Sequence, residues 1–256
     1  MSSKLEYTLA GMVGLAASSC AMAGDLSTAT DPTFRLAVIF SPHKTELSAP
    51  SFMASVGQLP KDHSNEGAGY YGFLGEANFG KVSLGVDYLT GTSNTVAGGL
   101  DYTPNSPTFN PLTHVNTELI SLLAGYNVVD HPAIGKLDVT LGYFRQWDQP
   151  SISPANWFDG LEIGIKGRRA WDDKFALTYR IGYVPNLAAH GNAKDANVMT
   201  GKNAWNFRLG AEVPVHKSFS VVAGYEKIVA KYKFVVDDSN ISATSAGFYL
   251  GGMVSF

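Results

Sequence analysis

Apolar residues alternate with small or polar residues at a period of two along most of the chain. In the segment 137–143 every second residue is apolar, and the residues between them are Asp138, Thr140 and Gly142. Segments 175–183 and 205–213 alternate in the same way. Because successive side chains of a strand point to opposite faces, each segment is predicted to be a strand with one apolar face. No helical periodicity competes over comparable lengths, so we expect an all-β chain.

Ten strands are predicted from this alternation and from the turn residues between segments. We expect them near residues 33–40, 69–79, 82–90, 115–126, 137–147, 157–168, 174–184, 204–213, 218–229 and 244–256. Short connections then alternate with longer ones, which cover residues 41–68, 91–114, 148–156, 185–203 and 230–243. An even strand count with this asymmetry is typical of transmembrane barrels that have short periplasmic turns and long extracellular loops. Lipid does not satisfy an open strand edge, so the first and last strands must pair and close a single antiparallel barrel.

The N-terminal segment is typical of an export signal. Lys4 is followed by an apolar run from Leu9 to Ala21, and Ala21-Met22-Ala23 matches the small-x-small cleavage pattern. We therefore expect a signal peptide at 1–23 and the barrel at 24–256. A retained anchor is less favoured because the apolar run is shorter than the roughly 20 residues that span a bilayer. Lipidation at Cys20 is a further alternative, although Ala17 stands where a bulkier aliphatic residue is usual.

The last strand carries a resemblance to a known family. Phe248, Leu250, Val254 and Phe256 share one face of a segment that reaches the last residue. This pattern resembles the C-terminal assembly signal of bacterial outer-membrane β-barrel proteins, and the chain as a whole resembles the small barrels of the OmpA, OmpX and OmpW type. The resemblance implies a location in the outer membrane and contact with its lipid and lipopolysaccharide. It also implies recognition of the C-terminal strand by the barrel-assembly machinery.

Aromatic residues are expected to gather at the two ends of the strands. One group falls where strands meet the long connections and the other at the opposite end, as in the two interfacial girdles of membrane barrels. The predicted girdle residues are Trp147, Trp157, Trp171, Trp205, Phe219 and Phe256. A soluble lipocalin-like barrel, with its apolar face inside, is the alternative that alternation alone leaves open.

If the apolar face meets lipid, the other face lines the lumen. By parity that face carries ten charged residues: Arg35, Glu76, Asp87, Asp138, Glu162, Lys166, Arg180, Arg208, Glu212 and Glu226. Charges away from water need partners, so a network of interior ion pairs is one interpretation, and a lining that selects solutes is the other. Nine inward glycines favour a narrow passage, unless neighbouring aromatic residues such as Tyr249 cover them.

Composition and motifs exclude several functions. The net charge of −3 gives no support for nucleic-acid binding, and the single cysteine lies in the predicted signal peptide. His43, His63, His114 and His190 are placed in outer loops, with no serine motif around them and no Asp-x-His pair of the kind that omptin-like proteases use. We therefore predict no catalytic residues, no metal site and no cofactor.

Three functions stay open at this point. The leading hypothesis is a narrow porin-like channel for passive passage of small solutes. The alternative is a plugged structural or surface-interaction barrel that acts through its extracellular loops, and an outer-membrane enzyme is the least favoured. The oligomeric state is not predicted.

Overall fold

A computed structural model describes residues 32–48, 62–95, 100–101, 108–109, 113–131, 133–150, 156–171, 174–191, 199–234 and 240–256. The predicted signal peptide at 1–23 lies outside these residues. Within them, no helix is long and apolar enough to cross a membrane. Every regular element that they contain is a strand, so the all-β prediction is confirmed.

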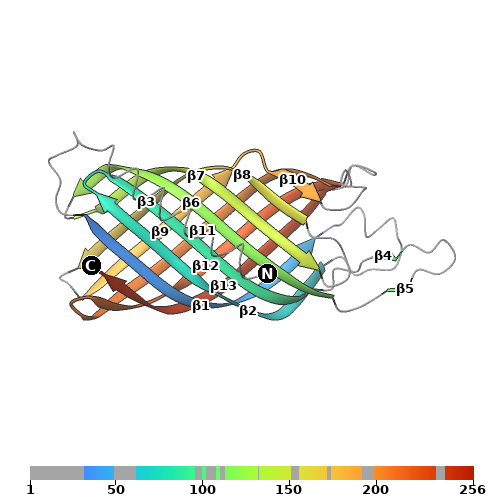
Figure 1. Cartoon of the computed structure of the whole chain (residues 1–256), viewed down its shortest axis with the longest axis horizontal. Coiled ribbons are helices and arrows are strands. Elements are labelled where there is room, and N and C mark those ends of the chain that lie inside the picture. The colour runs from blue at the N-terminus through green and yellow to red at the C-terminus, as the bar shows by residue number, and fades with distance from the viewer. Residues whose placement is uncertain are drawn as a thin grey trace, which may run out of the picture.

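Ten strands form the wall of the molecule (Figure 1). They are β1 (Thr33–Ser48), β2 (Asp62–Phe79), β3 (Val82–Thr95), β6 (Thr113–His131), β7 (Gly135–Pro150), β8 (Asn156–Trp171), β9 (Phe175–Val184), β11 (Met199–His216), β12 (Phe219–Phe234) and β13 (Asn240–Ser255). Three short strands are additional: β4 (Leu100–Asp101) pairs with β5 (Thr108–Phe109), and β10 (Ala188–Gly191) pairs with β8.

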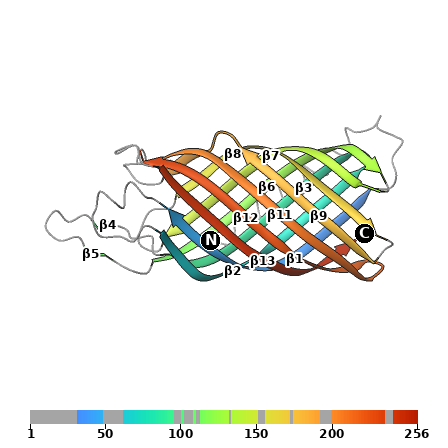
Figure 2. The same cartoon turned by 180° about the vertical axis from the view of Figure 1, so that it is seen from behind.

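The ten wall strands close into an antiparallel barrel. Each pairs with the next along the chain, β8 pairs with β9, and β1 pairs with β13. Phe34 and Phe256 complete the seam between the last two, because the backbone N–H of each donates to the carbonyl of the other at 2.8 and 3.0 Å. Figure 2 shows the seam strands β1 and β13 side by side, seen from behind. The predicted strand count, closure and antiparallel order are confirmed.

The barrel has two unlike ends, which we call the turn end and the loop end. Tight connections join β2 to β3, β6 to β7, β8 to β9 and β11 to β12 at the turn end, where β1 begins and β13 ends. Two of these turns use left-handed glycines, since Gly80 has φ 60° and Gly135 has φ 91°. The loop end carries the remaining connections.

The strands run further toward the loop end than the sequence predicts. Residues 41–48, 62–68, 91–95 and 199–203, which alternation assigned to loops, belong to strands, and only residues 151–155 separate β7 from β8. About 9–11 residues suffice to cross a membrane, whereas β3 has 14 and β6 has 19. The predicted long loops are therefore shorter than expected. The ladder of hydrogen bonds continues past the point where the outward residues stop being apolar, so the alternation signal ends before the strand does.

One wall strand is interrupted near the loop end. The register between β8 and β9 pairs Ile163 with Tyr183, but β10 pairs Ala188 with Asp159, which is one residue out of step. Residues Pro185 to Leu187 form the bulge that absorbs this extra residue. The Leu187 side chain is buried among interior apolar residues, and its N–H donates to the Lys202 carbonyl at 3.3 Å. The bulge thereby connects β10 to β11.

The apolar face of the wall points outward. Val38, Leu141, Leu161 and Leu250 are 58–65% exposed, and Val139, which points the same way on β7, is 51% exposed. The alternate residues on the same strands are buried inside, among them Ala37, Thr140, Glu162 and Tyr249. A soluble lipocalin-like barrel would show the reverse arrangement. The outward apolar face is the arrangement that a membrane barrel requires.

Candidate functional site

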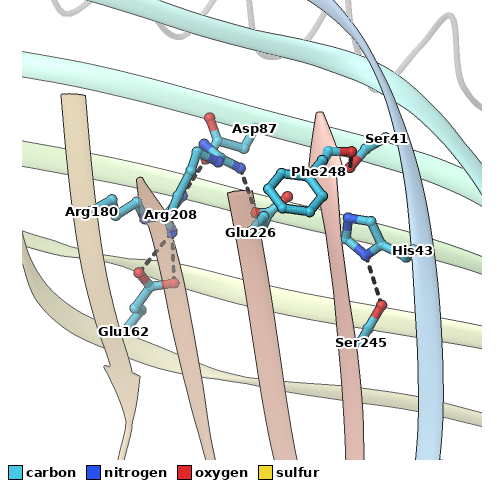
Figure 3. Close-up of polar contacts among 9 residues, drawn as sticks. All are labelled: Ser41, His43, Asp87, Glu162, Arg180, Arg208, Glu226, Ser245 and Phe248. Carbon is cyan, nitrogen blue, oxygen red and sulfur yellow. Dashed lines mark hydrogen bonds and ion pairs between the residues drawn. The ribbon is translucent and has the colours of Figure 1, made fainter. Parts of the chain in front are cut away.

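The centre of the lumen is occupied by five charged side chains, which we call the central ion-pair cluster. They form one chain of contacts in the order Glu162, Arg180, Asp87, Arg208 and Glu226. Arg180 donates to both Glu162 oxygens at 2.7 and 2.9 Å, and Arg208 donates to Glu226 at 2.7 Å (Figure 3). Asp87 accepts from Arg208 at 2.8 Å and from Arg180. All five are largely or wholly removed from solvent.

This cluster crosses the barrel. Asp87 lies on β3 and Arg208 on β11, and in the closed order of ten wall strands these two are five strands apart in either direction. Their 2.8 Å contact therefore spans the lumen between opposite walls. Glu162 is fully buried and Glu226 is 1% exposed, so water does not hydrate these carboxylates. The guanidinium groups replace that hydration, as buried charges require.

A second set of charges lies closer to the turn end, and we call it the inner ion-pair cluster. Lys166 contacts Glu76 at 2.7 Å and Asp138 at 3.8 Å. Arg35 contacts Glu76 at 3.5 Å and also pairs with Glu212. Glu212 in turn accepts from Arg168 at 2.9 Å. The two clusters together contain all ten residues that parity assigned to the lumen, and each has at least one ion-pair partner.

Several glycines of the lumen face do not leave open space. A Cβ atom at Gly182 would collide with the Glu162 carboxylate, and one at Gly210 or Gly224 would collide with the Tyr249 hydroxyl. At Gly125 the Ser83 hydroxyl fills the position, and it donates to Asp138 at 2.8 Å. The glycines therefore make room for the charged clusters and for Tyr249. Neighbouring side chains thus occupy the space that the glycines leave. The glycine-rich lumen face, which was the main sequence argument for a narrow passage, no longer supports one.

An apolar layer covers the central cluster on its loop-end side. Tyr70, Phe144, Ile39 and Leu89 are 1–2% exposed and belong to one interior hydrophobic group. Phe158 and Tyr232 join the same group with their ring centroids 4.3 Å apart. A permeating solute would have to displace both this layer and the charges below it.

The turn-end half of the lumen contains a cavity of about 290 Å³. Thr33, Asn78 and Lys81 lie on the side of the turns, and Asp87 and Tyr249 line the deep side. The inner ion-pair cluster forms much of its wall. The volume is at the lower limit of small-molecule sites, and the cavity does not continue into the apolar layer.

His43 contradicts its prediction as a loop residue. It lies on β1, points into the lumen and is 2% exposed, with its ring 4.8 Å from that of Tyr70. Its Nδ1 is 2.8 Å from the Ser245 hydroxyl on β13 (Figure 3). The prediction was wrong because β1 continues to Ser48. Residue 43 is an even number of positions from the lumen-facing Arg35, so strand alternation places His43 on the lumen face as well.

The other histidines predicted in outer loops also lie on strands. His190 belongs to β10, where its ring stacks on Trp157 at 5.4 Å and its Nε2 is 3.4 Å from Asp159. His63 belongs to β2 and His114 to β6. Among the residues that the structure describes, no three His, Cys, Asp or Glu side chains are grouped so that they could hold a metal ion.

The predicted girdle aromatics occupy both ends of the outer wall. Toward the loop end, Trp147 and Trp157 are cross-strand partners with ring centroids 5.7 Å apart, and Trp205 contacts Tyr183 at 4.4 Å. Toward the turn end, Trp171 stacks on Phe175 at 5.2 Å. Phe256 stacks on Phe34 there, and Phe219 is 40% exposed. That these rings lie at the two membrane interfaces stays a prediction.

Arg168 is the lumen residue that sequence reasoning missed. It shares the parity of Glu162 and Lys166 on β8, but the predicted strand ended at its position. Parity within the predicted strand 157–168 already places Arg168 on the lumen face. Ser41 lies one residue beyond the predicted strand 33–40; it is fully buried on β1 and donates to the Phe248 carbonyl at 3.2 Å, and extending that strand by parity would have found it.

Comparison with known proteins identifies the architecture. No known family profile matches the sequence, and no curated protein matches it either. Among solved structures, the chain is similar to the outer membrane protease OmpT from Escherichia coli, with a TM-score of 0.60, 11% identity, and coverage of 91% of this chain and 99% of that one. It also matches an outer membrane channel from Pseudomonas putida F1 (TM-score 0.42, 14% identity, 91% and 98% coverage) and Neisserial surface protein A (0.40, 11%, 87% and 97%). The fold is that of bacterial outer-membrane β-barrels.

Proposed function

We propose that this protein is an outer-membrane barrel whose lumen is closed to solutes, and that it acts as a structural or surface-interaction protein through its loop end. The fold and the outward apolar face support the membrane location. In that location the wall contacts lipid and lipopolysaccharide, and β13 with Phe256 is the segment that the barrel-assembly machinery would recognise.

One observation carries the closed lumen. The Asp87–Arg208 contact joins opposite walls at 2.8 Å, and the apolar layer lies directly beyond the central ion-pair cluster. Water-filled pores need a continuous polar route, and the buried Tyr70 and Phe144 interrupt it in the described residues.

A narrow channel is the second candidate. The observation in its favour is the cavity of about 290 Å³ with its charged wall, which would form the turn-end half of a passage. For conduction, the central ion-pair cluster and the apolar layer would have to rearrange together.

Planar-bilayer recordings separate these candidates. The purified protein should give no discrete conductance over a range of salt concentrations. A triple variant combines Arg208→Ala and Glu226→Ala, which remove a buried pair without leaving either charge alone, with Phe144→Ala, which opens the apolar layer; it should conduct if the cluster and the layer together are the seal. The matched control, Lys136→Ala with Asp130→Ala, removes an exposed pair 3.5 Å apart and should stay silent. Discrete steps from the unaltered protein would contradict the closed lumen.

A role at the cell surface would depend on the segments that the sequence predicts to be extracellular. Deletion of residues 49–61 or 102–107, each replaced by a short Gly-Ser linker, should abolish adhesion of expressing cells to host or neighbouring cells while the barrel still assembles. Unchanged adhesion by both deletions would contradict the surface-interaction role.

We further propose that the protein is not an enzyme, although OmpT is a protease by name. The His43–Ser245 contact is the arrangement nearest to a catalytic pair in the described residues, and its histidine is buried under Tyr70. Peptide and lipid substrates should therefore be left intact by the unaltered protein. Hydrolysis that His43→Ala abolishes would contradict this proposal.

A further inference from the structure

The cavity at the turn end has a basic wall, and the proposed function gives it no ligand. Its basic lining residues are Arg35, Lys81, Lys136, Lys166, Arg168, Arg180 and Arg208. Its acidic lining residues are Glu76, Asp87, Asp138 and Glu212. Seven basic groups thus face four acidic ones. Gly80 and Lys81 of the exposed β2–β3 turn belong to the same wall, so solutes reach the cavity from the turn end.

The acidic groups of this wall are fully occupied by donors. Glu76, Asp87 and Glu212 each have two basic ion-pair partners. Asp138 has one, and it also accepts hydrogen bonds from a hydroxyl at 2.8 Å and from a side-chain amide at 2.9 Å. Because each carboxylate is shared between several donors, the basic groups are not all neutralised in return. The charge left over in the wall is positive.

The basic groups with donors to spare lie at the mouth of the cavity. Among the described residues only the Nε of Arg168 has a hydrogen-bond partner, the Glu212 carboxylate at 2.9 Å, and the Arg168 side chain is 42% exposed. Within the same part of the chain, Lys81 forms no ion pair. Lys136 contacts the carboxylate of Asp130 at 3.5 Å, and both side chains are more than half exposed. Exposed pairs of this kind are weak, so Lys136 is available to a ligand.

These three residues, which we call the mouth cations, lie on neighbouring parts of the wall. Lys136 and Arg168 are register partners on β7 and β8. The Lys81 carbonyl accepts from the Asn127 N–H at 2.7 Å, which places the β2–β3 turn against β6, the strand next to β7. The two glutamates of the central ion-pair cluster do not line the cavity. An anion at the mouth therefore meets positive charge from three sides and no carboxylate that lacks a partner.

The mouth cations suit an anion with several oxygen atoms. The two terminal nitrogens of a guanidinium donate in a fixed fork that fits two oxygens of one phosphate group. The lysine ammonium groups are point charges that attract the same group from other directions. A cavity of about 290 Å³ admits only a small ligand. We infer that this cavity binds a phosphate group, either free or as the monoester of a small molecule, between Arg168 and the two lysines of the mouth.

Titration with inorganic phosphate tests the inference, which depends on neither the closed lumen nor the surface role. The purified protein in detergent is titrated by calorimetry near neutral pH, where one phosphate per protein should bind and added sodium chloride should weaken the binding. Arg168→Gln should weaken it about ten-fold, the loss expected for one charge-assisted hydrogen-bonded pair. Glu212 keeps Arg35 as its partner in this variant, so no buried carboxylate is left alone. Lys81→Gln removes an exposed charge and should weaken the binding about three-fold.

Two matched controls remove basic groups from the same end of the barrel without changing the cavity. Arg169→Gln alters the next residue of β8, whose guanidinium lies 4.4 Å from the centroid of the Trp171 ring. Lys217→Gln alters an exposed lysine of the β11–β12 turn that lies outside the cavity lining. Both controls should bind phosphate as tightly as the unaltered protein. β-Sheet circular dichroism establishes that every variant is folded.

Glycerol phosphate in the same titration distinguishes the two forms of the ligand. Tighter binding than that of inorganic phosphate assigns a monoester, and weaker binding assigns the free ion. Absence of saturable phosphate binding would overturn the inference. Equal weakening by the cavity variants and the controls would also overturn it, because the turn end would then attract anions without a site. Succinate that binds more tightly than either phosphate compound would overturn the assignment to a phosphate group.

Discussion

The lumen charges are specific in their partners. Arg180 offers its guanidinium to Glu162 and Asp87, and Arg208 offers its own to Asp87 and Glu226. Each arginine thus lies between two carboxylates, while Asp87 lies between two arginines. Because acidic and basic groups alternate along this chain of contacts, each charge lies beside at least one opposite charge. The five residues together carry a net charge of −1. Removal of one member would leave the others without compensation, which is more costly than removing a pair.

The close packing of side chains against lumen glycines gives a prediction for single residues. Gly182→Ala should lower the free energy of unfolding by about 1–3 kcal/mol, because the added methyl group overlaps the Glu162 carboxylate that Arg180 holds in place. Gly85→Ala is the matched control on the same face, where the nearest atom would be 3.5 Å away, and it should change stability by less than about 0.5 kcal/mol. Urea titration in lipid vesicles measures both. A Gly182 variant as stable as the Gly85 variant would mean that the lumen is not tightly packed there.

The alternation of side chains along each strand identified which residues face the lumen, but not which of them are in contact with each other. Period-two alternation assigns Asp87 and Arg208 to one face without the structure, because a strand has only two faces. It does not indicate that they touch, since that depends on how ten strands close and which positions then lie opposite. Their separation of 121 residues in sequence carries no local signal. The same holds for His43 and Ser245, whose contact depends on the seam between β1 and β13.

Strand length was the property of the elements that the sequence predicted least well. Alternation ends where outward residues change from apolar to polar, as on β12, where Lys227 and Lys231 follow Val221 on the outer wall. The hydrogen-bond ladder has no such limit, and β12 stays paired with β13 up to Lys233. The apolar pattern therefore measures the part of a strand in lipid and not the whole strand.

Labelling of single cysteines tests this distinction between the two parts of a strand. A membrane-impermeant maleimide should modify Lys231→Cys on intact cells, because that position lies on β12 beyond the apolar segment. Leu250→Cys, an outward position on β13 that is 60% exposed in the isolated chain, should not react because lipid covers it. The predicted mature chain has no other cysteine to interfere. Equal reaction at both positions would contradict the assignment of the strand ends to water.

The seam between β1 and β13 gives a second prediction at the scale of elements. Phe256→Ala should slow assembly of the barrel in cells, because the Phe256 ring stacks on Phe34 at 5.9 Å and ends the strand that closes the sheet. Phe248→Ala, on the same strand and face and 72% exposed, should have a weaker effect. The fraction of heat-resistant, compact protein on unboiled gels gives the measurement. A reversed order of the two variants would exclude a special role of the terminal residue.

For the molecule as a whole, the central ion-pair cluster couples distant parts of the wall. β3 and β11 are not paired through their backbones, yet the side chains of Asp87 and Arg208 join them through the lumen. We expect unfolding in urea to be a single transition, with the same midpoint by circular dichroism and by tryptophan fluorescence. Midpoints that differ by more than the error of measurement would indicate that part of the wall unfolds alone.

The cross-lumen contact also has a mechanical consequence. A thin-walled tube under unequal lateral pressure flattens, so that one diameter shortens while the perpendicular one lengthens. A contact between opposite walls resists lengthening of the diameter along which it lies, and the arginine side chains resist its shortening. The Asp87–Arg208 contact therefore holds the cross-section of this tube near its resting shape, at half height, where the wall is far from the support of either end.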